Sequence, residues 1–308
     1  MIKLLIGGSP CTYWSVCQKN NRETEPRGIG WELFENYLIA KEKFEPDFFL
    51  YENNKSAAQA IKDEIKKRLS VWDGSLFMDD SGARYIEINS ALVSAQNRQR
   101  FYVHNCGEVG QPEDRGVLFW RDIKEKNYCK CEKYKAKKTP SRIRMWNSGN
   151  GSGNKNTCKN ITMAEKTSTV TTKQDRSNCA GLIEFEDFFR YLTVEECCKL
   201  QTLPPDYCKS LSKNKAYKCL GNGWTAEVII HILNGALKDV PRDEKIVVLS
   251  MYDGIGTGRY CLDKMGFTNV EYHAFEIDKY AIKVAMSNYP DIIQHGDAYQ
   301  VRKDNFKI

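Results

Sequence analysis

The sequence lacks any apolar run long enough to cross a membrane and any regular spacing of its cysteines. A bilayer-spanning helix needs about 20 consecutive apolar residues, and no stretch of this chain approaches that length. The first residues also lack the extended apolar segment of a secretory signal. The 12 cysteines are scattered over 308 residues, unlike the dense framework of a small disulfide-stapled protein. We therefore expect reduced thiols, a cytoplasmic location and no membrane partner.

Acidic residues are the scarcer charge, and the imbalance is concentrated in one stretch. The chain has 46 Lys and Arg against 40 Asp and Glu, a net charge of +6. Between residues 121 and 144 alone, ten basic residues stand against three acidic ones. Local positive charge is typical of proteins that bind phosphate backbones, but a solvated lysine-rich surface has the same composition. Charge alone therefore leaves both interpretations open.

Strand and helix patterns alternate at both ends of the chain. Apolar runs at residues 2–6 and 47–52 predict buried strands, and amphipathic periodicity predicts helices at 30–44 and 56–72. From residue 245 the order is strand, glycine loop, helix, strand, helix and short strand. This alternation predicts an α/β fold with a doubly wound, mostly parallel sheet.

The middle of the chain interrupts this pattern. Residues 107–182 have few apolar side chains and include the tract NSGNGSGNKN, which cannot build a core. Order returns in TVEECCKLQTL, where Thr193 as the N-cap and Glu196 three residues later predict a capping box. We therefore expect a smaller domain inserted at 107–182, followed by helices at 183–240 that return to the α/β domain.

A glycine-rich loop follows the strand near residue 245, in VVLSMYDGIGTG. Glycines let backbone N–H groups approach a ligand at the start of a helix. Glu276 ends the next strand, where it can accept both ribose hydroxyls, and Asp297 ends the third, where it can meet an adenine amino group. A nicotinamide site would want a small residue in place of Arg259. S-adenosylmethionine therefore fits better, although a glycine turn that binds nothing remains the alternative.

Three further features fall at predicted strand ends. Cys11 follows the first strand, with Pro10 fixing the backbone before it, and Glu52 ends the second strand at the same edge. A thiolate can add to C6 of cytosine when a carboxylic acid hydrogen-bonds N3. Arg98 and Arg100 alternate on QNRQR and can hold a base carbonyl and a phosphate. Taken singly, each feature has a simpler interpretation: Cys11 as a buried structural cysteine, Glu52 as a surface glutamate, and the two arginines as a basic strand end.

Together these motifs resemble the cytosine-C5 DNA methyltransferase family over most of the chain. GGSPC is similar to its Pro-Cys loop, YENN to its Glu-Asn-Val motif, and AQNRQRFYV to its Gln-x-Arg-x-Arg motif. RYLTVEECCKLQTLPPDY resembles the block after the target-recognition region, and YKCLGNGWTAEVII the terminal Gly-Asn-Ser motif. SMYDGIGTG, FEID and HGDA resemble the three cofactor segments. The departures are Thr12 for Gln or Asn, Asn54 for Val, and Gly223 for Ser.

The order of the motifs differs from that of the family, in which the cofactor segments usually come first. Here they come last, so the chain resembles a circular permutant with LKDVPRDEK as the new joint, which requires neighbouring termini. The resemblance implies a permuted class I S-adenosylmethionine-dependent methyltransferase fold. Its parts would be a catalytic half at 1–106, a target-recognition region at 107–182, return helices at 183–240 and a cofactor-binding half at 241–308.

The resemblance also implies a reaction. A methyl group would pass from S-adenosylmethionine to C5 of a cytosine flipped out of a short double-stranded DNA sequence, leaving S-adenosylhomocysteine. Cys11 would bond C6 and Glu52 would stabilise the intermediate, while Arg98, the safer assignment, and Arg100 would hold the base. The expected cofactor contacts are Pro10, Asn222, Trp224, Tyr252, Asp253, Gly254, Gly256, Thr257, Gly258, Glu276, Ile277, Asp297 and Ala298. The expected DNA contacts are Ser9, Thr12, Val16, Cys17, Arg22, Arg27, Gly28, Arg142, Arg144, Asn147, Thr172 and Arg176.

Other functions stay open at this point. A similar catalytic set serves tRNA cytosine-C5 methyltransferases, and a catalytically silent DNA-binding homologue is a third reading. Zinc could bind Cys129, Cys131, Cys158 and Cys179, but their irregular spacing favours no metal. We expect a monomer on DNA, in the nucleoid of a prokaryote or encoded by a phage, with a partner restriction endonuclease as an open question.

Overall fold

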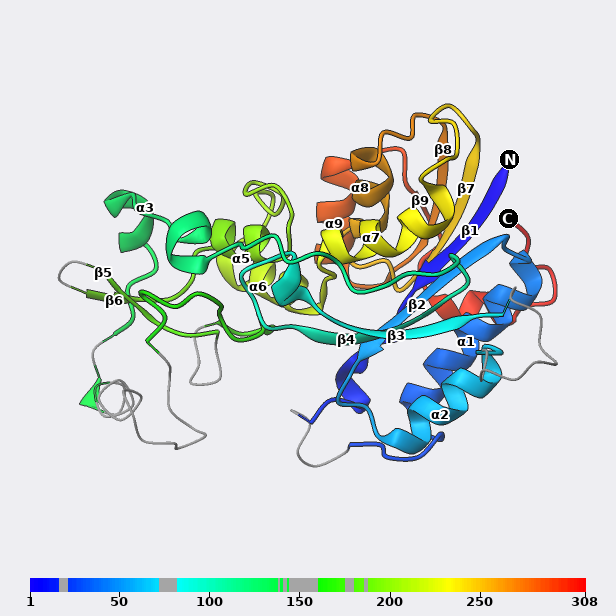
Figure 1. The fold of residues 1–308 in the computed structure, drawn as a ribbon, viewed down its shortest axis with the longest axis horizontal. Coiled ribbons are helices and arrows are strands. Elements are labelled where there is room, and N and C mark those ends of the chain that lie inside the picture. The colour runs from blue at the N-terminus through cyan, green and yellow to red at the C-terminus, as the bar shows by residue number, and fades with distance from the viewer. Residues whose placement is uncertain are drawn as a thin grey trace. The chain divides into compact units, whose positions relative to one another are not determined.

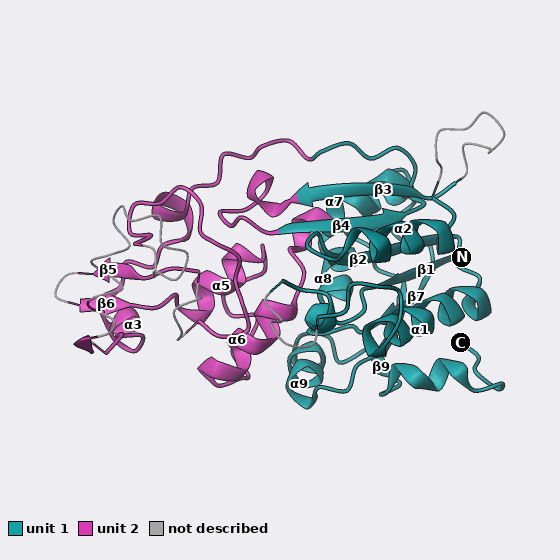
Figure 2. Ribbon diagram, turned by 90° about the horizontal axis from the view of Figure 1, so that it is seen from below, with its two compact units in different colours: residues 1–88, 99–111, 229–308 teal, residues 89–98, 112–228 magenta. Residues whose placement is uncertain are grey.

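The chain folds into two compact units in a computed structural model. The structure describes residues 1–16, 22–71, 82–137, 139–140, 143, 160–174, 180–185 and 188–308. Unit 1 comprises residues 1–88, 99–111 and 229–308, and unit 2 comprises 89–98 and 112–228 (Figure 2). Unit 2 therefore begins earlier and ends later than the insertion expected at 107–182.

A seven-stranded sheet forms the centre of unit 1, in the order β3-β4-β2-β1-β7-β8-β9. Its strands are β1 (Ile2–Gly7), β2 (Phe48–Asn54), β3 (Arg84–Asn89), β4 (Gln99–His104), β7 (Ile246–Met251), β8 (Val270–Phe275) and β9 (Ile293–Gln294). β1 pairs in parallel with both β2 and β7, and β8 pairs in parallel with β7 and β9. β4 runs antiparallel to β2. The prediction of a mostly parallel α/β sheet is confirmed.

Helices cover both faces of this sheet (Figure 1). The helices α1 (Ile29–Phe44) and α2 (Gln59–Arg68) lie on one face, and α7 (Ala226–Leu237), α8 (Thr257–Lys264) and α9 (Lys279–Asn288) lie on the other. Every residue of β7 is buried, as expected of a central parallel strand covered on both sides. Among the helices that the structure describes, none is long and apolar enough to cross a membrane.

Both chain ends reach the C-terminal end of α1. Lys3 Nζ donates to the Phe44 carbonyl at 2.6 Å, and Lys43 Nζ donates to the carbonyls of Val301 and Lys303 at 2.8 and 2.7 Å. Figures 1 and 2 place the N- and C-termini near each other from two directions. The last three strands in the sequence thus extend the sheet from β1, the first strand, and the termini are neighbours as predicted.

Unit 2 has shorter regular elements. They include a π-helical turn η3 (Phe119–Ile123), α3 (Tyr128–Glu132), the antiparallel pair β5 (Ile183–Phe185) and β6 (Phe188–Arg190), α5 (Val194–Leu200) and α6 (Lys213–Asn222). α5 begins with the predicted capping box of Thr193 and Glu196. The Glu196 carboxylate also accepts two 2.8 Å bonds from the fully buried Arg190 guanidinium. This buried ion pair joins β6 to the first turn of α5.

Candidate active site

Cys11 lies just beyond the carboxyl end of β1. It is the first residue of the 3-10 turn η1 (Cys11–Tyr13), and Pro10 precedes it with a φ of −51°. The Cys11 carbonyl accepts hydrogen bonds from Trp14 N at 3.1 Å and Ser15 N at 3.0 Å. The Cys11 side chain is partly exposed. A thiol open to solvent is therefore carried on a backbone held by proline on one side and by a turn on the other.

Hydrogen bonds tie the residue two places before Cys11 to β2. Ser9 Oγ lies 2.7 Å from the Tyr51 hydroxyl, and Asn53 Nδ2 donates to the Ser9 carbonyl at 2.9 Å and to Tyr51 at 3.1 Å. Tyr51 and Asn53 alternate along β2 and so share one face of the strand. Ser9 is only 3% exposed, so the side chain predicted to contact DNA is buried beneath the loop.

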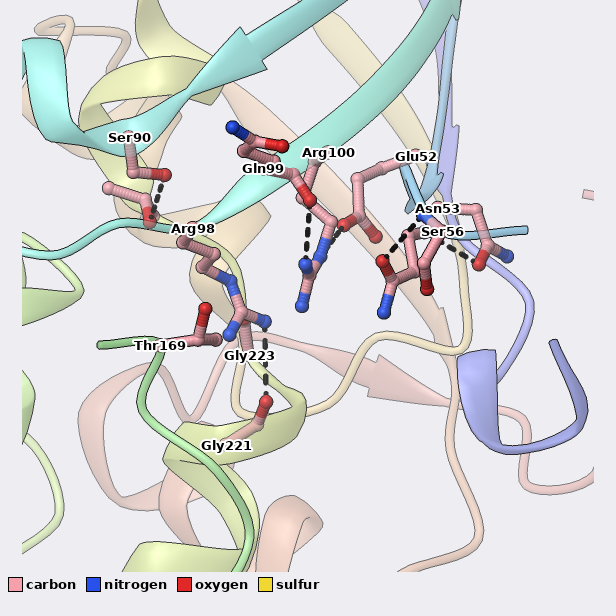
Figure 3. Close-up of polar contacts among 12 residues, drawn as sticks. Glu52, Asn53, Ser56, Ser90, Arg98, Gln99, Arg100, Thr169, Gly221 and Gly223 are labelled. Atoms are coloured by element: carbon pink, nitrogen blue, oxygen red, sulfur yellow. Dashed lines mark hydrogen bonds and ion pairs between the residues drawn. The ribbon is translucent and has the colours of Figure 1, made fainter. Parts of the chain in front are cut away.

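Glu52 occupies the opposite face of β2 and forms an ion pair with Arg100 of β4. Arg100 forms an ion pair with Glu52 (Figure 3), in which Arg100 Nε lies 2.9 Å from Glu52 Oε1. The side chains of Arg100 and Glu52 are 9% and 12% exposed. A Cβ added to Gly8 would lie 3.0 Å from Glu52 Oε2. Glu52 is therefore packed against Gly8 of the loop that carries Cys11, and Arg100 is its ion-pair partner.

Arg98 has other partners than Arg100, although the sequence groups the two. It belongs to unit 2 and is 3% exposed. Its guanidinium donates to the carbonyls of Gly223 at 2.7 Å and Gly221 at 3.2 Å (Figure 3). It also donates to the Val170 carbonyl at 3.3 Å. Arg98 therefore holds the end of α6 and the turn after it, where Asn222 and Trp224 lie.

Two glutamines that we did not single out from the sequence support the same turn. Gln96 Nε2 donates to the Leu200 carbonyl at 2.6 Å and to Gln201 Oε1 at 2.8 Å. Gln201 Nε2 in turn donates to the carbonyls of Leu220 at 2.7 Å and Gly223 at 3.1 Å. Gln96 alternates with Arg98 and Arg100 in QNRQR, and this spacing indicates in the sequence that Gln96 belongs with the two arginines.

The glycine loop after β7 adopts backbone angles that few residues tolerate. Tyr252, Gly254 and Gly256 have φ values of 61°, 66° and 75°, and Gly256 is the N-cap of α8. A Cβ added to Gly254 would meet no atom within 4 Å, so space is open above it. The Tyr252 hydroxyl donates to the Leu33 carbonyl at 2.7 Å, which anchors its ring to α1.

Two carboxyl groups hold this loop in place. Asp253 Oδ1 accepts 2.7 Å hydrogen bonds from Ser250 and from Tyr272, and burial raises the pKa of Asp253 to about 6. Glu276 Oε2 accepts from Gly254 N at 2.9 Å, and its Oε1 accepts from the two following backbone N–H groups, each at 2.8 Å. Burial also raises the pKa of Glu276. The glycine loop and Glu276, both singled out from the sequence, are thus joined by a direct hydrogen bond.

The remaining cofactor candidates divide between the units. Ile277 is 73% exposed and Ala298 is buried. Asp297 is exposed and accepts a hydrogen bond from Tyr299 N at 3.0 Å. Arg259 bonds Asp291 through Nε at 3.0 Å and Nη2 at 2.9 Å. The cofactor candidates Asn222 and Trp224 belong to unit 2, whereas Pro10, Thr257, Gly258, Ile277, Asp297 and Ala298 belong to unit 1.

Several DNA-contact candidates already have partners within the chain. Arg22 donates to the carbonyls of Trp14 and Ser56, and Arg27 pairs with Glu25 at 3.1 Å on the surface. Thr12 and Val16 are exposed, Gly28 is the N-cap of α1 with a φ of 87°, and Thr172 is half-buried. The candidates outside the described residues are Cys17, Arg142, Arg144, Asn147 and Arg176.

The cysteines considered for zinc cannot be compared as a set, because Cys158 and Cys179 lie outside the described residues. Within the described ranges, no group of three or more His, Cys, Asp or Glu residues could hold a metal ion. Cys131 is buried and Cys129 is exposed.

Comparisons with known proteins bear on this arrangement. No curated protein matches the chain. Among solved structures, the Dnmt2 methyltransferase of S. pombe is similar, with 14% identity, a TM-score of 0.44 and coverage of 63% of this chain and 67% of that one. The family model described as C-5 cytosine-specific DNA methylase matches residues 1–106 and 114–238, which include Cys11, Glu52 and both arginines. On the extent of that match, the chain belongs to the C-5 cytosine-specific DNA methylase family, whose reaction is methyl transfer to cytosine.

Proposed function

We propose that this protein methylates C5 of a cytosine flipped out of double-stranded DNA, through a covalent bond between Cys11 Sγ and C6. The observation that carries this proposal is the position of Glu52, which packs against Gly8 of the Cys11 loop and forms an ion pair with Arg100. A base extruded from the stack can reach such a strand-end site, whereas a stacked base cannot. The three side chains would supply a nucleophile, a hydrogen-bond partner for N3 and a cation for one ring.

Each residue has a definite task in this reaction. The Cys11 thiolate adds to C6, and N3 of the ring takes up a proton that it shares in a hydrogen bond with Glu52, so that the ring can accept the electron pair. We assign Arg100 rather than Arg98 to the base carbonyl, because Arg98 is occupied by three backbone carbonyls. Once C5 carries the methyl group, loss of the C5 proton to a base lets Cys11 leave and restores the aromatic ring.

The loop after β7 fits S-adenosylmethionine. Space is open above Gly254, Ile277 exposes an apolar side chain, and Glu276 is fixed beside both by three backbone donors. These features suit a ribose at Glu276 and an adenine face at Ile277. When bound, the cofactor would supply an electrophilic methyl group. Glu276 and Ile277 would orient it.

We further propose that the chain is a circular permutant, with 1–106 as the catalytic half and 241–308 as the cofactor-binding half. The family match ends at residue 238, yet β7, β8 and β9 continue the sheet beside β1. The neighbouring termini support the same proposal. The inserted region at 107–182 would recognise the target sequence, with lysines on phosphates and a few side chains on bases.

The test is covalent trapping with a cytosine analogue. Duplex DNA that carries 5-fluorocytosine should give a denaturation-resistant complex with the wild-type protein and cofactor, because fluorine at C5 blocks the final elimination. Cys11→Ser should give none, whereas Cys129→Ser, the same change at an exposed cysteine, should be trapped like the wild type. A complex that persists in Cys11→Ser would contradict the proposed nucleophile.

Substrate competition separates DNA from tRNA. Labelled methyl transfer to unmethylated duplex DNA should be unaffected by a tenfold excess of tRNA. Transfer to tRNA in preference to DNA would replace our proposal by the alternative of a tRNA cytosine-C5 methyltransferase. Binding without transfer to either would favour a catalytically silent homologue.

A further inference from the structure

Tyr51 has no role in the reaction proposed above, yet its hydroxyl reaches the loop of the nucleophile. The hydroxyl lies 2.7 Å from Ser9 Oγ and accepts a bond from Asn53 Nδ2 at 3.1 Å. Asn53 also bonds Ser9 Oγ at 3.2 Å and the Ser9 carbonyl at 2.9 Å. These contacts close a three-residue network directly before Pro10 and Cys11.

The surroundings of Tyr51 make this hydroxyl specific. Tyr51 is fully buried, and its ring packs edge-on against Phe34 and Tyr37 at centroid distances of 5.1 and 5.0 Å. A phenylalanine would fill the same apolar space without a buried polar group that must be satisfied. Burial also raises the pKa of Tyr51, so the hydroxyl stays neutral and can donate. Packing of the ring therefore does not explain why this position carries a hydroxyl that bonds Ser9.

We propose that Tyr51 is a positioning residue for Cys11: its hydroxyl fixes Ser9, and the short Ser9–Pro10 backbone passes that constraint to the thiol. Pro10 fixes the φ angle between Ser9 and Cys11, so the backbone at Cys11 has little freedom to move once Ser9 is held. Catalysis by addition to C6 depends on such alignment, because a small misplacement of a nucleophile is costly in rate. The inference rests on the proposed role of Cys11 as the nucleophile.

The test is Tyr51→Phe beside Tyr37→Phe. Both variants remove one hydroxyl from the same aromatic cluster, but the Tyr37 hydroxyl has no hydrogen-bond partner within the described part of the chain. We expect Tyr51→Phe to lower kcat about five- to tenfold, with KM for DNA and for the cofactor unchanged. Tyr37→Phe should leave both constants unchanged. Equal kcat values in the two variants would overturn the proposal.

A second readout does not need methyl transfer. The rate at which iodoacetamide alkylates Cys11, followed on the peptide that carries it, should change in Tyr51→Phe and stay constant in Tyr37→Phe. Ser9→Ala breaks the same bond from the other side, together with the bond from Asn53 to Ser9 Oγ, so the double variant with Tyr51→Phe should be no slower than Ser9→Ala alone. Additive losses would contradict a shared interaction.

These measurements also separate the two claims. If Cys11→Ser retains full methyl transfer, the proposed nucleophile is wrong, whatever Tyr51 does. If Cys11→Ser is inactive while Tyr51→Phe matches Tyr37→Phe in kcat and in alkylation, the nucleophile stands and only the positioning role of Tyr51 fails.

Discussion

Arg98 and Arg100 stand two positions apart and have separate sets of partners. We predict that Arg98→Ala lowers the free energy of unfolding by about 2–3 kcal/mol, because the buried Val170 carbonyl and the half-buried carbonyls of Gly221 and Gly223 lose a charged donor. Arg100→Ala should instead lower kcat/KM at least tenfold with a smaller loss of stability, since its main partner is Glu52. Thermal unfolding and methyl-transfer kinetics on both variants check this. Equal losses of stability would contradict the division.

Asp253 gives the stability a pH dependence. Burial raises the pKa of its carboxyl to about 6 in the folded state, above the value of about 3.9 for an unfolded chain. The folded state therefore binds the proton more tightly, and stability present in acid is lost as the pH rises from about 4 through about 6. Asp253→Asn should lack this loss, which is at most about 3 kcal/mol.

The check is the melting temperature of both proteins across that pH range. Asp239→Asn, in an exposed loop, is the matched control and should follow the wild type. An Asp253→Asn protein that loses stability in parallel with the wild type would contradict the prediction.

Some residues of the site could be predicted from the sequence and others could not. Cys11 and Glu276 follow strands and Glu52 lies near the end of one, and parallel strands bring their carboxyl ends to one edge. The partners of Arg98 could not be foreseen, because Gly221 lies 123 residues away and accepts through its backbone carbonyl. A carbonyl acceptor leaves no mark in the side-chain pattern. The burial of Ser9 could not be foreseen either, because its hydroxyl bonds Tyr51, a residue of another strand.

The start of α5 carries its own stability test. Glu196 caps the helix and neutralises the buried Arg190. We predict that Glu196→Gln costs about 3–5 kcal/mol, because it leaves a buried guanidinium without its counter-charge. Asp122→Asn, in the exposed pair with Arg121, should cost less than about 1 kcal/mol. Denaturant unfolding of both variants checks the contrast, and similar costs would contradict it.

Helix boundaries show what local patterns can and cannot predict. The capping box at Thr193 and Glu196 was predictable, because both partners lie within one turn. The helix predicted for 56–72 instead begins at Gln59. Asn54 explains the difference: its carbonyl accepts from Ala57 N and its side chain from Ser56 N, both at 3.0 Å. Asn54, which stands where the family has valine, thus forms the turn before the helix.

At the level of the whole molecule, strand alternation predicted the mostly parallel sheet, but composition did not predict the limits of the compact units. Unit 2 includes residues 89–98 and the helices α5 and α6 as well as the expected insertion. Buried polar contacts explain part of this, since Ser94 Oγ donates to the Leu200 carbonyl at 2.6 Å. Such contacts join segments that are distant in the sequence and are invisible to a composition scan.

The proposed permutation predicts that the chain can be opened elsewhere. A variant that joins residue 308 to residue 1 through a short glycine-serine linker, and opens between Asp239 and Val240, should fold with a melting temperature within a few degrees of the wild type. The residues around the new opening are largely exposed, and the joined ends are neighbours. A variant that fails to fold would contradict the idea that the two halves of the α/β domain can follow each other in either order along the chain.

The central claim is tested most directly by the methylated product itself. Unmethylated genomic DNA should be incubated with S-adenosylmethionine and the wild-type protein or Cys11→Ser, and its cytosines read by bisulfite sequencing. Our account predicts 5-methylcytosine at one short sequence in the wild-type reaction and none with Cys11→Ser. Methylation that persists in Cys11→Ser, or no methylation of DNA by a folded wild-type protein that binds it, would contradict the account.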